Sequence, residues 1–303
     1  MLFCVAVRAD VLVVASSGAS HVTLIDPDSG TKLAEVPVGK GPHEVVASLD
    51  GRFAWVADSG ATSVTLVDLK KRAVAKTFEL KECGPHDLAL PSSGTPLFVT
   101  CASHKALLEI DPRTGAELKR HDLAVEGAWM TAVSPDGGRA FTANLEGGGM
   151  TAIDRSSGRV TNLKTAEGEI GIAVTADGRQ VWLTNMSTNK VAVFDSATNA
   201  ALGTFDSVAE SPLRVRITPD GKRAVMTFGK TKKVGVFDVA TRKAVQWIDI
   251  DSGSKVLTIS PDGMKAAVSA PHKDTVLILD LVNGKMLRKI DVAGKPDGVA
   301  WAK

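Results

Sequence analysis

The chain has 303 residues, of which 44% are hydrophobic and 23% are charged, so its composition is that of a globular protein long enough to bury a substantial core. Lysine and arginine number 36 against 34 aspartate and glutamate, and a formal charge of +2 provides no broad basic field for duplex nucleic acid. No apolar run of the sequence approaches the roughly 18 residues that a transmembrane helix needs.

The first nine residues form a short apolar segment that ends in Val7-Arg8-Ala9. This ending weakly resembles the end of an export signal, but the basic start and the longer apolar stretch of a complete signal are absent. Two interpretations stay open: a truncated signal, or the first strand of the fold.

An apolar strand that ends in aspartate recurs seven times along the chain, at intervals of 42, 43, 43, 41, 43 and 42 residues. A second anchor, a turn of the Asp-Gly or Ser-Gly type, precedes each of these aspartates from the second one onward. Two anchors in fixed phase indicate an internal repeat. The strand-ending aspartates are Asp26, Asp68, Asp111, Asp154, Asp195, Asp238 and Asp280.

Each repeat is predicted to form four short strands, A to D. Strand A, such as residues 131–134, precedes the Asp-Gly turn, whose glycine permits the positive φ angle of a tight hairpin. Strand B follows the turn, strand C carries the aspartate, and strand D is the alternating polar run after it. Four strands at this period predict an all-β fold, a seven-bladed β-propeller of four-stranded antiparallel blades, formed by residues 1–303 as a single domain.

The two ends of the chain are expected to share one blade. The last repeat stops after residues 296–301, and the N-terminal part supplies strands B, C and D before the first complete strand A. A shared blade closes the ring and removes the open strand edges that otherwise invite aggregation.

Several segments match one known repeat pattern, namely Val38-Gly39-Lys40-Gly41-Pro42-His43, Ser134-Pro135-Asp136-Gly137, Ser260-Pro261-Asp262-Gly263 and Leu183-Thr184-Asn185. On these segments the repeat resembles the YVTN-type propeller family over essentially the whole chain. The tyrosine of that family is replaced here by tryptophan, phenylalanine or smaller residues. Its members are mostly exported, so the resemblance implies a periplasmic or extracellular location, with the cytoplasm as the alternative. The motifs of the family are structural, and the resemblance transfers no catalytic residue.

Two sets of recurring residues are predicted to be structural. The strand-B aromatic residues recur in register, which favours packing between blades. The strand-ending aspartates are too regular to mark one site, and they are expected to form hydrogen bonds in turns. The aromatic positions are Trp55, Phe98, Phe141 and Trp182.

Two successive positions at the start of strand A differ between repeats, and they are expected to ring the mouth of the central channel. The first two repeats present histidine beside a carboxylate there, while Arg214 and Lys255 form a cationic side. Such a mouth suits a small anionic or zwitterionic ligand, with histidine available for proton transfer. A solvated rim without a special role is the alternative. The predicted ligand-binding residues are His43, His86, Trp129, Arg214, Lys255 and Asp297.

Repeat two also contains a pattern of cysteine and histidine: Cys83, His86, Cys101 and His104. The first pair opens strand A and the second pair follows strand B, so all four side chains could meet at one rim. Two thiolates and two imidazoles would suit zinc or copper. A disulfide between Cys83 and Cys101, or two free thiols, are the other interpretations.

The leading hypothesis is a non-enzymatic, exported module that binds a ligand or a protein partner with one face of the ring. It is favoured because no nucleophile elbow, phosphate loop, dinucleotide fingerprint or haem-attachment motif is present in the sequence. One alternative is a lactonase- or lyase-like enzyme with His43, Glu44, His86 and Asp87 as metal ligands or acid–base groups. Another is a metal- or redox-linked carrier that uses the cysteine and histidine pattern of repeat two.

Overall fold

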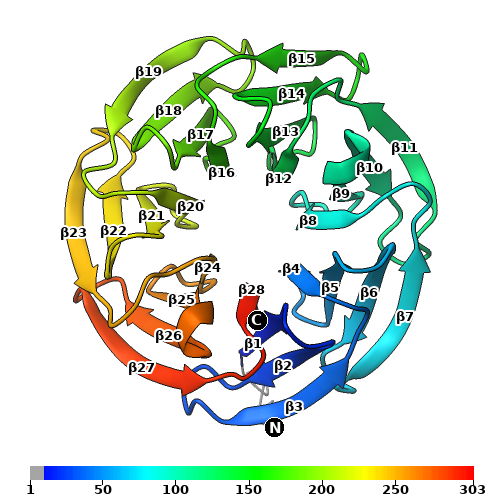
Figure 1. Cartoon of the computed structure of the whole chain (residues 1–303), viewed down its shortest axis with the longest axis vertical. Coiled ribbons are helices and arrows are strands. Elements are labelled where there is room, and N and C mark those ends of the chain that lie inside the picture. Colours follow the sequence, from blue (N-terminus) through cyan, green and yellow to red (C-terminus); the bar gives the residue numbers. More distant parts are fainter. Residues whose placement is uncertain (1–9) are drawn as a thin grey trace, which may run out of the picture.

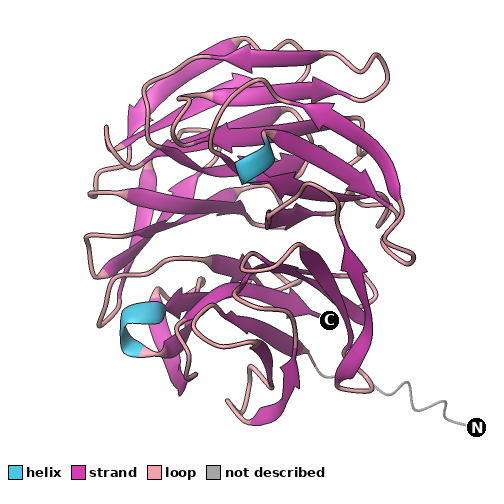
Figure 2. Ribbon diagram, turned by 45° about the vertical axis from the view of Figure 1, so that its right-hand side comes forward, coloured by secondary structure: helices cyan, strands magenta, loops and turns pink. Residues whose placement is uncertain are grey.

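The structure is a computed structural model that describes residues 10–303, so both interpretations of the N-terminal segment lie outside the described residues. Seven four-stranded antiparallel sheets, the blades, surround a central channel (Figure 1). The predicted all-β, seven-bladed propeller is therefore confirmed. Within residues 10–303 the helical segments are two short 3-10 turns, η1 (Ala102–His104) and η2 (Pro271–Lys273), drawn in Figure 2. Neither has the length or the apolar character needed to cross a membrane.

The blades are numbered here along the chain, and each one runs outward from an inner strand beside the channel. Blade 1 holds β4 (Pro42–Ala47), β5 (Phe53–Asp58), β6 (Ser63–Asp68) and β7 (Ala73–Glu79); blade 2 holds β8 (Pro85–Ala89), β9 (Leu97–Cys101), β10 (Ala106–Ile110) and β11 (Glu117–Asp122). Blade 3 holds β12 (Ala128–Val133), β13 (Arg139–Asn144), β14 (Met150–Asp154) and β15 (Val160–Leu163); blade 4 holds β16 (Glu169–Val174), β17 (Gln180–Asn185), β18 (Lys190–Asp195) and β19 (Ala201–Asp206). Blade 5 holds β20 (Pro212–Ile217), β21 (Arg223–Phe228), β22 (Lys233–Asp238) and β23 (Ala244–Asp249); blade 6 holds β24 (Leu257–Ile259), β25 (Lys265–Ala270), β26 (Thr275–Asp280) and β27 (Lys285–Asp291). Blade 7 holds β28 (Pro296–Ala302), β1 (Val11–Ser16), β2 (His21–Ile25) and β3 (Lys32–Pro37).

Blade 7 contains both ends of the chain, as the repeat phase predicted. Its inner strand β28 pairs with β1, so that Leu12 lies opposite Trp301 and Val14 opposite Val299. All seven residues of β28 are buried. The indole N–H of Trp301 also donates to the carboxylate of Asp10 at 2.7 Å. The C-terminal strand thus closes the ring through backbone pairing and side-chain burial together.

The hydrophobic core is divided into clusters that lie between neighbouring blades. One cluster joins Trp55 and Leu66 of blade 1 to Leu88 and Leu108 of blade 2. The strand-B aromatics are buried, with 5% exposure for Trp55 and none for Phe98, Phe141 and Trp182. Their predicted packing role between blades is confirmed, which leaves the function to other positions.

The recurring aspartates form the expected hydrogen bonds in turns. The carboxylate of Asp26, for example, accepts the backbone N–H groups of Asp28 and Ser29, each at 2.9 Å. The glycines of the A–B turns have φ angles between 62° and 74°, a region that favours glycine. Equivalent bonds follow Asp68, Asp111, Asp154, Asp195, Asp238 and Asp280.

Candidate functional site

A β-bulge places the channel-mouth residues in six of the blades. In blade 2, Pro85 pairs with Cys101 and Leu88 with Val99, so His86 and Asp87 together face the single residue Thr100. Blades 1, 3, 4, 5 and 7 show a register shift at the same point of the inner strand. A bulge redirects side chains without ending the strand. In these six blades the first predicted ring position is therefore a bulged residue, and in blades 1, 2, 5 and 7 the second position is bulged as well.

Threonine hydroxyls of the second strand fix this bulge and connect neighbouring blades. The Thr100 hydroxyl accepts the backbone N–H of Asp87 at 2.8 Å and donates to the carbonyl of Trp129, in blade 3, at 3.0 Å. Thr184 and Thr227 make the same two bonds in blades 4 and 5. The threonine of the Leu-Thr-Asn motif thus positions the backbone of the mouth, a role that the sequence analysis did not assign.

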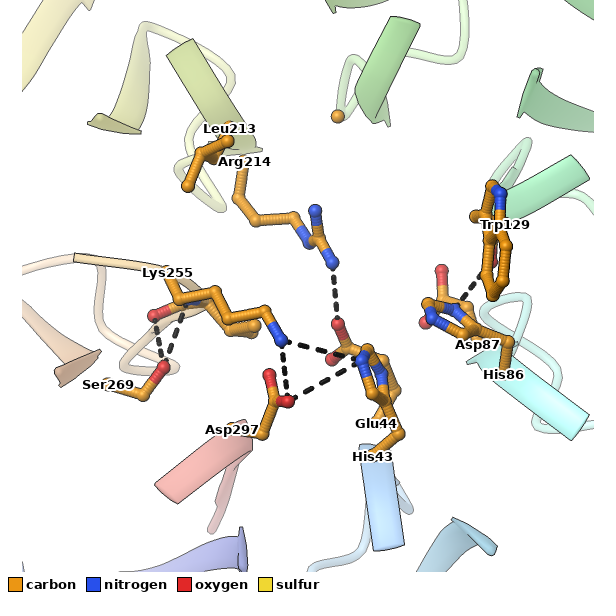
Figure 3. Close-up of polar contacts among 12 residues, drawn as sticks. His43, Glu44, His86, Asp87, Trp129, Leu213, Arg214, Lys255, Ser269 and Asp297 are labelled. Atoms are coloured by element: carbon orange, nitrogen blue, oxygen red, sulfur yellow. Dashed lines mark hydrogen bonds and ion pairs between the residues drawn. The ribbon is translucent and has the colours of Figure 1, made fainter. Parts of the chain in front are cut away.

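Three charged or ionisable groups from adjacent blades meet on one side of the mouth (Figure 3). The Lys255 ammonium lies 2.6 Å from the Asp297 carboxylate and 3.5 Å from Nε2 of His43. The same imidazole nitrogen is 3.4 Å from Asp297 Oδ2. The side chain of Lys255 is 35% exposed, whereas that of Asp297 is 3% exposed. The cation is thus open to solvent, and its counter-charge lies beneath it.

Two atoms of this cluster have no hydrogen-bond partner among residues 10–303. They are Nδ1 of His43 and Oδ1 of Asp297, and both are buried. Burial lowers the pKa of His43 to about 4, so its imidazole is neutral near pH 7. A buried polar atom without a partner costs about 1–3 kcal/mol, and a ligand that supplied the missing bond would recover that cost.

Aromatic rings continue the mouth from this cluster toward blade 3. The imidazoles of His43 and His86 have centroids 3.9 Å apart and planes tilted by 40°, and the Trp129 ring meets His86 edge-on at 4.6 Å. Nδ1 of His86 lies 3.0 Å from the Trp129 carbonyl, which can only accept, so this nitrogen carries the proton. The Trp129 indole donates to Glu146 at 2.7 Å, a contact with no signal in the repeat pattern.

Glu44 and Arg214 form a buried ion pair across the ring. They come from blades 1 and 5, the distance between Arg214 Nη2 and Glu44 Oε1 is 3.1 Å, and each side chain is 3% exposed. Burial raises the pKa of Glu44, and the Arg214 charge opposes that shift. Arg214 is therefore engaged by Glu44, rather than exposed beside Lys255 as one cationic side of the mouth.

Asp87 holds the backbone of the channel instead of facing the mouth. Its carboxylate accepts the N–H groups of Leu88 and Thr131, each at 2.8 Å. Burial raises the pKa of Asp87 to about 6, with a further contribution from Glu44. Because both oxygens are bonded to the backbone, Asp87 acts as a bridge between β8 and β12.

The cysteines of repeat two form a disulfide, Cys83–Cys101, with the Cα atoms 4.7 Å apart. Both sulfurs are bonded to each other, so they provide no thiolates for the predicted four-ligand zinc or copper site. The structure therefore agrees with the disulfide interpretation. His104 is exposed on η1 and its Nδ1 lies 3.0 Å from the Ser103 hydroxyl. Within residues 10–303, no three histidine, cysteine, aspartate or glutamate side chains are grouped so as to hold a metal ion.

Comparisons with known proteins show the fold and leave the site unassigned. A family model described as outer membrane protein assembly factor BamB matches residues 104–219, which run from η1 of blade 2 to the end of β20 in blade 5. Together with the seven sheets, this match shows a chain built from β-propeller repeats, without identifying the YVTN type. Among curated proteins, none matches the chain significantly.

Three solved structures illustrate the likeness in fold. A functionally unknown protein from Desulfotomaculum acetoxidans has a TM-score of 0.82 at 12% identity, covering 96% of this chain and 98% of that one. Hydrazine synthase of Kuenenia stuttgartiensis has a TM-score of 0.70 at 18% identity, covering 83% of this chain and 87% of that one. The β-propeller domain of Cps50 (Swd1) from Myceliophteria thermophila has 0.72 at 13% identity, covering 82% and 86%. Identities this low carry the propeller fold alone.

Proposed function

We propose that this protein is a non-enzymatic binding propeller that holds a small zwitterionic ligand at the channel mouth. The observation that carries the proposal is the cluster of Lys255, Asp297 and His43, with two buried polar atoms that no group of the described residues satisfies. An ammonium has three donors, and Lys255 uses two of them within the cluster. A ligand carboxylate would take the third, and a ligand ammonium would donate to Asp297.

The rest of the mouth supports a ligand with an apolar body. Trp129, Ile170 and Leu213 occupy the first ring position in blades 3, 4 and 5, opposite the charged side, and each is half-buried. Pockets for small molecules combine mostly apolar walls with a few placed polar groups. An amino acid with an apolar side chain has this distribution of charge and surface.

The bonds made by three of the four catalytic candidates, all except His43, favour binding over catalysis. Glu44 is bonded to Arg214, and the Asp87 carboxylate to two backbone N–H groups. Nδ1 of His86 is bonded to the carbonyl of Trp129. An acid or base must reach the proton that it transfers, and these groups are already committed within the protein.

Calorimetric titration with three matched probes tests the proposal: phenylalanine, 3-phenylpropionate and phenethylamine share a ring and differ in charge. We expect phenylalanine to bind most tightly, and Lys255→Gln or Asp297→Asn to weaken it at least about tenfold, equivalent to about 1.4 kcal/mol. Lys230→Gln, which removes an exposed cation from the same face, is the control and should leave the affinity unchanged. Equal binding of the three probes, or no effect of either mouth variant, would contradict the proposal.

We also propose that the protein is exported and that its repeats are of the YVTN type. Disulfides persist mainly in oxidising compartments, so Cys83–Cys101 supports export. The Ser-Pro-Asp-Gly and Leu-Thr-Asn segments support the repeat type. Fractionation of cells that express the full gene tests the location, and recovery of the protein in the cytoplasm with reduced thiols would contradict it.

Loss of this disulfide is expected to lower the free energy of unfolding by about 3 kcal/mol, because the bond restricts the unfolded chain over a sequence separation of 18 residues. Urea unfolding of the Cys83→Ala/Cys101→Ala variant measures the change. Wild-type protein treated with a reductant is the matched comparison and should show the same loss. If neither change lowers stability, the bond does not stabilise the fold.

A further inference from the structure

The central channel contains a cavity of about 340 Å³ that is separate from the mouth cluster. Inner strands from all seven blades line it, and its residues follow the mouth positions along each strand, except for Asp87, which is itself a mouth position. Glu44 and Arg214 come between the two regions, since the mouth holds residue 43 of β4 while the cavity begins at Val45. The buried ion pair therefore divides the channel into a mouth and an inner cavity.

One position of the inner strand is small or uncharged in six blades and arginine in the seventh. It lies two residues after the second mouth position, and all seven residues line the cavity. Small side chains on the other blades leave space that the long side chain of Arg216 can enter. The seven residues are Val46, Ala89, Ala132, Ala173, Arg216, Thr258 and Ala300.

The guanidinium of Arg216 is little used by the protein. Nη1 donates to the carbonyl of Val215 at 3.1 Å, and among residues 10–303 no carboxylate lies within 4.0 Å of the guanidinium. A guanidinium has five N–H donors, so most of its hydrogen-bonding capacity is free. The side chain is half-buried and hence still reachable from solvent.

The nearest opposite charges are engaged elsewhere. The Arg216 charge acts on the carboxyl groups of Glu44 and Asp87, in each case against the larger effect of burial, which raises their pKa values. Glu44 is bonded to Arg214, and Asp87 to the N–H groups of Leu88 and Thr131. Arg216 thus faces the cavity as a cation without an ion-pair partner in the part of the chain that the structure describes.

We propose that this cavity is a second binding site, which takes a small organic monocarboxylate with an apolar body. Arg216 presents the planar donor fork that matches a carboxylate. Leu90, Ile172, Val174 and Trp301 supply apolar wall around it. The volume is near the lower end of the 300–1,000 Å³ typical of ligand pockets, which limits the ligand to a small molecule. Because the wall holds one arginine and the carboxylate of Asp87, a ligand with one negative charge is favoured over a ligand with two.

This inference does not rest on the zwitterion site at the mouth. Lys255, Asp297 and His43 do not line the cavity, and among the described residues Arg216 makes no hydrogen bond or ion pair with them. The two proposals therefore predict opposite responses to the same variants. A monocarboxylate at Arg216 should be insensitive to Lys255, and a zwitterion at the mouth should be insensitive to Arg216.

Calorimetric titration of the whole protein with benzoate, and with its neutral counterpart benzamide, tests the site. We expect saturable binding of benzoate that is at least about tenfold tighter than that of benzamide, because only benzoate can form the charge-assisted pair. Arg216→Gln should abolish this difference, and Arg216→Lys should restore part of it, since lysine keeps the charge but lacks the fork. Lys255→Gln should leave benzoate binding unchanged.

Three outcomes would overturn the proposal: no saturable binding of benzoate, equal affinity for benzoate and benzamide, or benzoate affinity unchanged within twofold in Arg216→Gln. If only Lys255→Gln abolished benzoate binding, benzoate would bind at the mouth, and this result would equally exclude a site at Arg216. Thermal unfolding of each variant without ligand verifies that it is folded. Arg216 is half-buried and makes no ion pair among residues 10–303, so the Arg216→Gln variant should still unfold in one cooperative transition.

Discussion

Deletion of residues 294–303 is expected to abolish the closed ring. The deletion removes β28, whose residues are all buried and pair with β1. Val299 and Trp301 belong to the cluster between blades 6 and 7, while Ala300 and Ala302 belong to the one between blades 7 and 1. Burial of a large apolar side chain contributes about 1.5–3 kcal/mol, and a domain has about 5–15 kcal/mol in total. Loss of this strand from both interfaces therefore threatens most of the stability.

Size-exclusion chromatography and near-ultraviolet circular dichroism of the truncated protein measure this result. We expect aggregated or expanded protein, because the freed edge of β1 offers unpaired backbone groups to other chains. Adding a synthetic peptide of residues 294–303 should restore the compact monomer. A scrambled peptide of the same composition is the control and should not. A truncated protein that stays monomeric with an unchanged melting temperature would show that ring closure does not depend on β28.

Arg214→Met is expected to lower the free energy of unfolding by about 3–5 kcal/mol near pH 7, because it leaves Glu44 buried without its counter-charge. The Glu44→Met/Arg214→Met double variant should recover most of this loss, since apolar side chains of similar volume can replace a buried pair. Arg179→Met provides the control, because the ion pair of Arg179 with Asp177 is exposed and should contribute less than about 1 kcal/mol. Urea unfolding of all three variants measures the differences.

The loss in Arg214→Met should also depend on pH. Burial raises the pKa of Glu44 in the folded protein, whereas the charge of Arg214 lowers it. Removal of Arg214 should therefore raise the pKa of Glu44 further. A carboxyl group whose pKa is raised by folding destabilises the fold above its unfolded pKa, and this penalty disappears once the group is protonated in both states. The stability deficit relative to the wild type should therefore shrink as the pH falls to about 4, near the unfolded value for glutamate. A deficit independent of pH would assign the effect to lost packing.

The ion pair that this variant removes also separates the two proposed sites. Glu44 lies next to the mouth residue His43, and Arg214 is two residues before Arg216 of the inner cavity. The Glu44→Met/Arg214→Met double variant keeps the side-chain volume of the pair but removes its charges. Binding of the mouth and cavity probes to that variant would show how far each site depends on the charges of the pair.

The alignment of the repeats predicted how far along the channel axis each inner-strand residue lies, because hydrogen bonding and turn geometry recur within every blade. Alignment on the Asp-Gly turn placed His43, His86, Lys255 and Asp297 in one ring, and the structure brings them to the same mouth (Figure 3). It did not reveal that three of them, His43, His86 and Asp297, lie in β-bulges. The bulge depends on pairing between strands, and its signal was the threonine that recurs opposite it on strand B.

Partners across the ring could not be predicted from the repeat. Arg214 and Lys255 were grouped as one cationic side, yet Arg214 pairs with Glu44, 170 residues away, and Lys255 with Asp297 in the neighbouring blade. Arg216 lies beyond the two mouth positions that the alignment on the Asp-Gly turn identifies. In the same alignment, Arg216 is nevertheless the one charged residue at a position that holds Ala132 and other small residues in the remaining repeats.

The sequence by itself determined the propeller, the number of blades and the sharing of one blade by the two chain ends. These features follow from turn residues and strand patterns that act locally and repeat at a fixed period. Only the tertiary structure decided which charges remain free, and whether Cys83 and Cys101 join. Closing the ring brings together side chains from distant repeats, and the energy of a charge depends on its distance from its partner and on its burial. Neither quantity is encoded within one repeat.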